Sequence, residues 1–260
     1  MDIDFIILAI SLYFTIVGIL QVQTIFLYVI MNCNLRIIKF VLKITFRTDN
    51  DNIAFKWAVR NGNIEITKLL LPRANLDDVW CSLCIKTAAE NGDVEMVKLL
   101  LSNPRVDPSI CSNLSIINAS ANGHVEVVRL LLADKRVDPS DGDNYAIKRA
   151  CRNGHVEVVR LLLADPRVKS YADFNLPIRN ASINGYVEIV RLLLADHRVD
   201  PSDFDNLAIR RASYEGHLEV VKLLLQDSRV DASKAKSDNP EVQELLAQWK
   251  YFPRMYKNDL

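Results

Sequence analysis

The sequence has no excess of charge of either sign and few cysteines. It contains 32 lysines and arginines against 32 aspartates and glutamates, so its formal net charge is zero. A neutral total argues against a general nucleic-acid or membrane-surface binder. The cysteines are an odd set with irregular spacing, which favours a reducing compartment over a disulfide framework. They are Cys33, Cys81, Cys84, Cys111 and Cys151.

The sequence also lacks the motifs of common catalytic sites. It has no glycine-rich phosphate loop and no nucleophile placed beside a base. Cys81 and Cys84 have the spacing of a zinc or redox pair, but no second pair and no histidine is near them in sequence. We therefore expect no enzyme activity, no cofactor and no metal. The alternative is an enzyme or metal protein that uses these two cysteines, and stoichiometric zinc in the purified protein would support it.

Charge is absent from one long stretch, residues 5–35. About 20 apolar residues span a bilayer, so Phe5–Met31 is long enough for a transmembrane anchor. Acidic residues precede this run and basic residues follow it. By the positive-inside rule, the remainder of the chain would then face the cytoplasm.

The same stretch supports a second interpretation. Asn32–Leu42 aligns with Asn61–Leu71, with Cys33 in the place of a glycine. Residues 22–42 would then be a degenerate capping repeat, and too little would remain before them to cross a membrane comfortably. The sequence leaves both interpretations open.

What the sequence has in quantity is one repeated segment. The run Asn153–Leu163 reads Asn-Gly-His-Val-Glu-Val-Val-Arg-Leu-Leu-Leu, and Asn122–Leu132 is nearly identical. Looser copies occur at Asn61–Leu71, Asn91–Leu101, Asn184–Leu194 and Glu215–Leu225. The spacing of their glycines is 30 residues once and 31 residues four times: Gly62, Gly92, Gly123, Gly154, Gly185 and Gly216. A fixed period of this size indicates stacked structural repeats.

Each repeat has the pattern of a helical hairpin. After the Gly154 turn, apolar residues at helical spacing predict one buried face: Val156, Val159, Leu162 and Leu163. Before the glycine, a shorter helix is predicted by Ile147, Ala150 and Cys151. We expect Asn144 to cap this first helix, and the residue after each glycine to cap the second. The segment Asp165–Val168 contains a proline and should end the second helix.

The run Gly154–Leu163 closely resembles the second-helix signature of ankyrin repeats, and the resemblance covers residues 52–231. It implies an all-α ankyrin-repeat solenoid of stacked helical hairpins with extended loops or short β-hairpins. The charge-free run predicts, separately, a hydrophobic N-terminal helix before this solenoid. The usual Thr-Pro-Leu-His start is replaced by Asn-x-x-Ile, and the glycine after the second helix is replaced by Asp-Pro-Arg-Val. The period is also 31 rather than 33. This variant is similar to arrays found in large DNA viruses of amoebae and in their hosts.

The chain is expected to have three parts. Residues 1–46 are the hydrophobic segment, residues 47–231 hold six repeats, and residues 232–260 form a capping helix with a tail. Asn239-Pro240-Glu241 has the residues of a helix start. An apolar stripe follows it and should close the last open face: Val242, Leu245, Leu246 and Trp249.

The positions that vary between repeats are the candidate binding positions. Counted back from each glycine, positions −5 and −2 of the first helix should point away from the core, and position −6 is mostly basic. The family resemblance implies that first helices and fingertip loops line a concave, partner-binding face. Arginine, tryptophan and tyrosine are common anchors of interfaces. The candidates are Trp57, Arg60, Trp80, Arg149, Arg152, Phe174, Phe204, Arg211 and Tyr214.

These residues predict a non-enzymatic scaffold that binds an acidic surface or segment of another protein. The main alternative is nucleic-acid binding along the Lys/Arg stripe, against which the neutral net charge argues. A second alternative is a ubiquitin-ligase substrate adaptor, although residues 232–260 contain no clear match to the extra C-terminal motif that such an adaptor needs.

Overall fold

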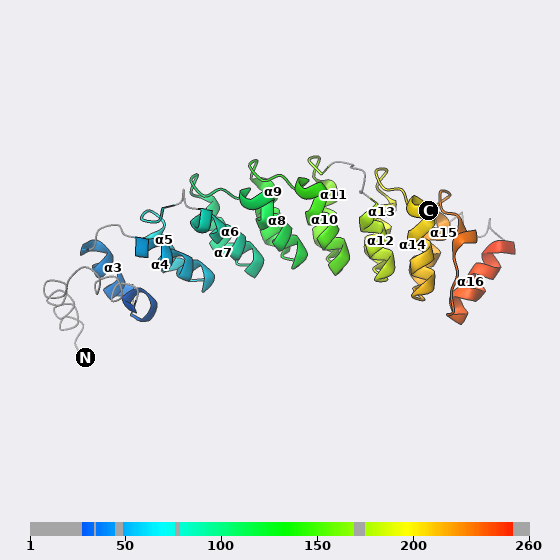
Figure 1. Cartoon of the computed structure of the whole chain (residues 1–260), viewed down its shortest axis with the longest axis horizontal. Coiled ribbons are helices and arrows are strands. Elements are labelled where there is room, and N and C mark those ends of the chain that lie inside the picture. Colours follow the sequence, from blue (N-terminus) through cyan, green and yellow to red (C-terminus); the bar gives the residue numbers. More distant parts are fainter. Residues whose placement is uncertain (1–27, 34, 45–48, 76–78, 169–174, 252–260) are drawn as a thin grey trace. The chain divides into compact units, whose positions relative to one another are not determined.

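The computed structural model describes residues 28–33, 35–44, 49–75, 79–168 and 175–251 (Figure 1). Throughout these residues the regular structure is helical, with no strand. This confirms an all-α array of helix pairs, with extended loops in place of the β-hairpins that were the other option. The hydrophobic run before residue 28 lies outside the described residues. The chain divides into two compact units, Met1–Ile110 and Cys111–Leu260.

The first unit contains two helix pairs that follow the N-terminal helices. Residues 28–32 are helical, and α3 spans Leu35–Ile44. The first pair is α4 (Asp49–Arg60) with α5 (Ile64–Leu70), and the second is α6 (Val79–Asn91) with α7 (Val94–Leu101). The helices of each pair pack on one another, and α4 packs on α6.

The second unit contains four helix pairs and a C-terminal helix. Their bounds are α8 Ile110–Ala121, α9 Val125–Ala133, α10 Asp141–Asn153, α11 Val156–Ala164, α12 Leu176–Ile183, α13 Val187–Leu194, α14 Asp203–Tyr214 and α15 Leu218–Gln226. A short 3₁₀ turn, η1 (Ala232–Lys234), then leads to α16 (Pro240–Tyr251). The first helices α10, α12 and α14 pack in sequence, and so do the second helices α11, α13 and α15.

The core lies between the helices of each pair and between neighbouring pairs. As predicted, Ile147 and Ala150 on α10, and Val159 and Leu162 on α11, are fully buried. Burial of each such aliphatic side chain stabilises the fold by roughly 1.5–3 kcal/mol. The second-helix face differs from the prediction in one respect. Val158 is buried there, whereas two predicted core residues, Val156 and Leu163, are only half-buried.

Three first helices begin with an unusual left-handed turn. Three consecutive residues in each turn have φ between 51° and 62°. The turns are Cys111–Asn113, Gly142–Asn144 and Phe204–Asn206. A left-handed conformation costs a non-glycine residue roughly 1–2 kcal/mol, and asparagine tolerates it better than most residues. An asparagine therefore suits the last position of each turn.

Two of these asparagines, Asn113 and Asn206, bind the following repeat. The Oδ1 atom of Asn113 accepts a hydrogen bond from the backbone N of Asp138 at 2.8 Å. The Oδ1 atom of Asn206 accepts one from the backbone N of Asp231 at 2.7 Å. The expectation that Asn144 caps α10 is wrong, because Ser140 is the N-cap and Asn144 lies within the left-handed turn.

The residue after each glycine has two different roles along the chain. In the first unit it caps the second helix as expected: Asn63 accepts from the N of Ile66, and Asp93 from the N of Met96. In the second unit the expectation is wrong, because no side-chain cap bond forms at His124, His155, Tyr186 or His217.

Two of these histidines instead reach back to the preceding repeat. The Nε2 atom of His155 lies 2.9 Å from the carbonyl oxygen of Ala121, and that of His217 lies 2.9 Å from the carbonyl oxygen of Ile183. Both bonds satisfy a carbonyl at the C-terminal end of a first helix, where backbone acceptors have no partner within the helix. The ring thus links neighbouring repeats.

The C-terminal helix begins as predicted. Asn239 Oδ1 accepts hydrogen bonds from the backbone N atoms of Glu241 and Val242, so it caps α16. Val242 and Leu245 are buried, and the rest of the predicted stripe, Leu246 and Trp249, is half-buried. This helix packs on α15.

Candidate functional site

The predicted binding residues lie on first helices in both units. Trp57 and Arg60 are on α4 of the first unit. In the second unit, Arg149 and Arg152 are on α10, whereas Phe204, Arg211 and Tyr214 are on α14. Trp80 lies in α6, but its side chain is outside the described part, and Phe174 is outside the described residues altogether. The structure therefore places the second-unit residues on two first helices that both pack on α12, and the α4 pair is considered by itself.

Their exposure separates two groups. Arg60, Arg152 and Arg211 are exposed, and so are two aromatic rings, with 68% of Phe204 and 66% of Tyr214 accessible. Trp57 and Arg149 are half-buried. The exposed group is therefore the part of the candidate set that a partner could reach directly.

Two of the candidates are already in contact with neighbouring side chains. The guanidinium of Arg149 lies 5.8 Å from the ring centroid of Tyr145, a residue the sequence analysis did not select although 45% of it is exposed. The ring of Phe204 is contacted from the preceding repeat, because the guanidinium of Arg179 lies 4.3 Å from its centroid. Such cation–π contacts contribute about 0.5–2 kcal/mol and hold both rings in place.

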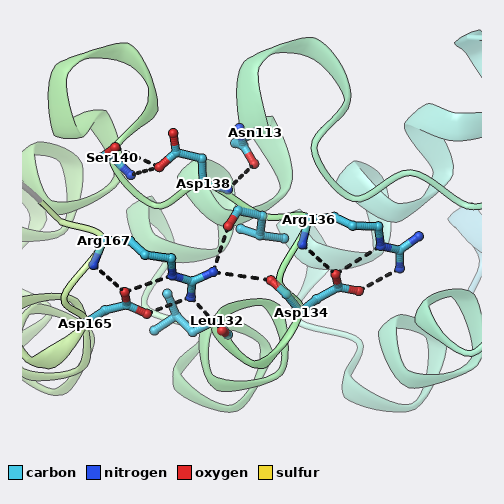
Figure 2. Close-up of polar contacts among 9 residues, drawn as sticks. Asn113, Leu132, Asp134, Arg136, Asp138, Ser140, Asp165 and Arg167 are labelled. Atoms are coloured by element: carbon cyan, nitrogen blue, oxygen red, sulfur yellow. Dashed lines mark hydrogen bonds and ion pairs between the residues drawn. The ribbon is translucent and has the colours of Figure 1, made fainter.

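The loops between helix pairs are held by an aspartate–arginine pair that the sequence analysis treated only as a helix stop. Arg167 donates from Nε and Nη2 to the carboxylate of Asp165, at 2.9 and 2.7 Å (Figure 2). The same guanidinium donates to the carbonyl oxygens of Leu132, at 2.6 Å, and Val137, at 2.9 Å, in the preceding repeat. One side chain thus joins two repeats.

The pair recurs in the two repeats that follow. Arg198 binds Asp196 and reaches the carbonyl oxygens of Leu163, at 3.0 Å, and Val168. Arg229 binds Asp227 and reaches the carbonyl oxygen of Val199 at 2.7 Å. The recurrence of Asp-x-Arg-Val with the glycine period was the signal in the sequence that could have revealed this contact.

The pairing changes the acidity of the aspartates. Side-chain hydrogen bonds from Arg167 hold the pKa of Asp165 below its ordinary value, although burial acts in the opposite direction. For Asp196, burial is the largest influence and raises the pKa, but the hydrogen bonds and charge of Arg198 together outweigh it and the pKa is lowered. These carboxylates therefore stay ionised and paired down to acidic pH.

Two comparisons identify the repeat. A family model for ankyrin repeats in three copies matches residues 85–176, and a second ankyrin-repeat model, for many copies, matches residues 178–225. The chain belongs to the ankyrin repeat family. No curated protein matches it. Ankyrin repeats generally mediate protein–protein interactions.

Within this ankyrin array, fewer of the basic residues at position −6 are exposed than the sequence suggested. Lys148 and Arg179 are only 9% and 7% exposed, because the first helix of the next repeat covers them. Arg179 lies 3.8 Å from Asp203 of that repeat as well as against Phe204. Arg210, on the last full first helix, is exposed. Most of the position −6 charge in this unit therefore serves the contact between ankyrin repeats.

The recurrent glutamates lie on the opposite side of each ankyrin hairpin. They are exposed and pair with the basic residue three positions later: Glu126 with Arg129, Glu157 with Arg160, Glu188 with Arg191, and Glu219 with Lys222. Exposed pairs of this kind contribute little stability. They form a solvated face with its charges balanced.

No group of three or more metal-binding side chains occurs in the described part of the ankyrin array. Cys84 is buried, and the side chain of Cys81 is outside the described part. Burial raises the pKa of the Cys151 thiol far above its ordinary value, so this cysteine is not poised as a nucleophile. Among the helices the structure describes, none has both the length and the apolar character needed to cross a bilayer.

Proposed function

We propose that the chain is a non-enzymatic scaffold whose second unit binds an acidic surface or segment of another protein. One observation carries the proposal. Two first helices, α10 and α14, which both pack on α12 between them, carry basic and aromatic residues at the same two positions of the repeat. These residues are Arg149 and Arg152 on α10, and Arg211 and Tyr214 on α14; Arg149 is half-buried and the other three are exposed. The apolar faces of these helices are buried in the array, so this row belongs to the part of α10 and α14 that a partner can reach.

The row suits an acidic partner because its charges are not neutralised in the way those of the opposite face are. In the second helices each exposed arginine has a glutamate three residues before it, as Arg160 has Glu157. Arg152 and Arg211 have no such neighbour in sequence, since position −3 from each is occupied by Arg149 and Ala208. Arginine can bind a partner carboxylate through two parallel hydrogen bonds.

The test is a comparison of two charge reversals of equal size on opposite faces. The row variant carries Arg149→Glu, Arg152→Glu and Arg211→Glu. The control variant carries Arg129→Glu, Arg160→Glu and Arg191→Glu on the second helices. We expect the row variant to lose the proteins that the unmodified chain captures from a cell extract, and the control to retain them. Capture that survives in the row variant, with both variants folded, overturns the proposal.

Nucleic-acid binding is the less favoured function. The Lys/Arg stripe on which it rests includes Lys148 and Arg179, whose side chains are covered by the next repeat. Affinity for DNA or RNA that falls steeply with salt would revive it. A ubiquitin-ligase substrate adaptor is a finer form of the scaffold proposal and would require ligase subunits among the captured proteins. The resemblance to arrays of amoeba-infecting viruses and their hosts extends the scaffold proposal to a partner from the host.

The N-terminal region adds an anchoring hypothesis. The charge-free run Phe5–Met31 supports a membrane anchor that leaves the repeats facing the cytoplasm. Its rival is the degenerate repeat, which draws support from residues 28–44, where Val29, Ile38 and Val41 are buried as Ala150, Val159 and Leu162 are. Fractionation of the full chain beside a chain that starts at Arg47 distinguishes them. The anchor requires that only the longer chain pellets with membranes and resists carbonate.

A further inference from the structure

The last helix has the sequence of the second helix of a seventh repeat. Asn239-Pro-Glu-Val-Gln-Glu-Leu-Leu aligns with His217-Leu-Glu-Val-Val-Lys-Leu-Leu, a shift of 22 residues where the other repeats shift by 31. Nine residues are therefore missing from this repeat. The segment that should contain its first helix has only the three-residue turn η1.

The contacts of α16 agree with this alignment. A Cβ atom placed on Gly154 would lie 2.9 Å from the Tyr186 ring of the next repeat, and one placed on Gly216 would lie 3.1 Å from the Asn239 side chain. The Asn239 side chain thus lies against Gly216 in the way that the Tyr186 ring lies against Gly154. Gln243 replaces the buried Val221 of the preceding repeat and is exposed. A polar residue is tolerated there because no first helix packs against it.

The missing helix leaves one side of α14 uncovered. At position −6, Lys148 and Arg179 are buried under the next first helix, but Arg210 is exposed. Beside it, a groove of about 470 Å³ lies between α14 and the segment formed by η1 and the residues just after it. It is lined by Leu207, Arg210, Arg211, Tyr214, Lys234 and Lys236.

The groove is basic. Its one acidic lining residue, Asp205, lies 3.6 Å from Arg210 and 3.0 Å from Lys234, and so offsets part of their charge. Arg211 and Lys236 have no carboxylate partner among the described residues. Leu207 and the ring of Tyr214 supply the apolar surface, on the helix against which a first helix would normally pack.

We propose that this groove is the docking site for an acidic amphipathic helix of a partner protein, which takes the place of the absent first helix of the seventh repeat. The apolar stripe of the incoming helix packs on Leu207 and Tyr214, and its carboxylates bind Arg211 and Lys236. Arginine–carboxylate pairs combine charge with two-point geometry, which selects an acidic helix over a neutral one. The inference rests on the scaffold function and names the place and chemistry of one partner.

The test uses the full chain and a fluorescein-labelled peptide about 12 residues long, the length of a first helix. The peptide has a leucine stripe at helical spacing with glutamates beside it. The control is a scrambled peptide of the same composition. We expect the patterned peptide to bind more tightly than the scrambled one, by fluorescence anisotropy, and to weaken as salt is raised. Equal binding of the two peptides overturns the proposal.

Two charge-reversal variants locate the site. Arg211→Glu with Lys236→Glu should weaken the patterned peptide at least about tenfold, whereas Arg149→Glu with Arg152→Glu, the same charge change on α10, should leave its affinity within about twofold. Circular dichroism and thermal melting confirm that both variants are folded. If the groove variant binds as the unmodified chain does, the groove is not the site.

The outcomes also separate this inference from the scaffold function. If the charge reversal on α10 abolishes capture of cellular proteins and the reversal in the groove does not, the scaffold proposal is supported and the groove proposal is overturned. Light scattering provides a further check. A chain that is dimeric before the groove reversal and monomeric after it would show that a second copy occupies the groove, which overturns the acidic-partner proposal.

Discussion

Arg167 holds Asp165 within its own loop and, with the same guanidinium, the carbonyl oxygens of the preceding repeat. The side chain of Asp165 is 12% exposed and that of Arg167 is 33% exposed, so the bonds are partly shielded from water. A bond to a charged group in such a setting is stronger than an exposed ion pair. The stability of the array should therefore depend on this arginine more than on the arginines of the outer face.

Replacing Arg167 by alanine tests this dependence. The change leaves the carbonyls of Leu132 and Val137 without their donor, and we expect it to lower the free energy of unfolding by about 1.5–3 kcal/mol. Arg160→Ala, which removes only an exposed pair with Glu157, should stay within about 0.5 kcal/mol. Urea unfolding followed by circular dichroism measures both. Equal losses in the two variants would contradict the role assigned to Arg167.

The lowered pKa of the paired aspartates predicts how stability depends on pH. A carboxyl group whose pKa is lower in the folded state stabilises the fold above its unfolded pKa, about 3.9 for aspartate. This contribution is lost as the pH falls through the folded pKa. The unmodified chain should therefore lose thermal stability as the pH drops below about 4.

Asp165→Asn isolates the contribution of one carboxylate to that pH dependence. The variant should be less stable than the unmodified chain at neutral pH. The difference should shrink below about pH 4, where this carboxyl group begins to protonate in the unfolded chain while the folded chain, with its lowered pKa, still holds it ionised. Melting temperatures from pH 7 to pH 3 measure this, with Glu157→Gln as an exposed control. A difference that is constant across this range would refute the pairing.

Gly154 combines a left-handed backbone with a close neighbour. Its φ is 83°, and an added Cβ would meet ring carbons of Tyr186 at 2.9 and 3.0 Å. Gly62 has φ 65°, but an added Cβ there would approach only Asp93 Oδ2, at 3.2 Å. We expect Gly154→Ala to destabilise more than Gly62→Ala, which carries mainly the backbone cost of about 1 kcal/mol.

A double variant separates the two costs at Gly154. Tyr186→Ala removes the ring, so Gly154→Ala should cost less in that background than in the unmodified chain. Thermal melting of the four chains gives the coupling between the two positions. If the costs simply add, the ring does not constrain the glycine.

Asn206 is predicted to matter both for its backbone and for its side chain. Asn206→Gly keeps the freedom to adopt φ 60° but loses the hydrogen bond to the N of Asp231. Asn206→Ala loses the same bond and also strains the backbone, so it should be less stable by about a further 1 kcal/mol. Chemical unfolding of both variants measures the gap, and an alanine variant as stable as the glycine variant would argue against the left-handed turn.

The sequence predicted the features that lie within a single repeat. The period placed the turn at Gly154 and the buried face of Ile147 and Ala150, because helical spacing alone decides which residues share a face. The cap at Asn239 was predictable for the same reason, since a cap bonds only to its own helix.

Contacts between repeats were not predictable in this way. His155 was expected to cap a helix, and Arg167 had no assigned role, but both side chains bind the preceding repeat. Spacing along the chain shows which residues recur, but it does not show what the next repeat presents to them. Lys148 and Arg179 were counted as part of an open basic face for the same reason. The candidate binding residues stay a prediction until the charge reversals are made.

The contact made by Arg167 has a consequence for how such a chain can change in length. Arg167, Arg198 and Arg229 each bind carbonyl oxygens of the hairpin before their own, and the carbonyls of Leu132 and Leu163 are equivalent acceptors in successive hairpins. A duplicated hairpin inserted between two others would supply an arginine to the hairpin before it and carbonyl acceptors to the hairpin after it. Growth or loss of whole units by gene duplication and recombination therefore needs no compensating substitution at the joints.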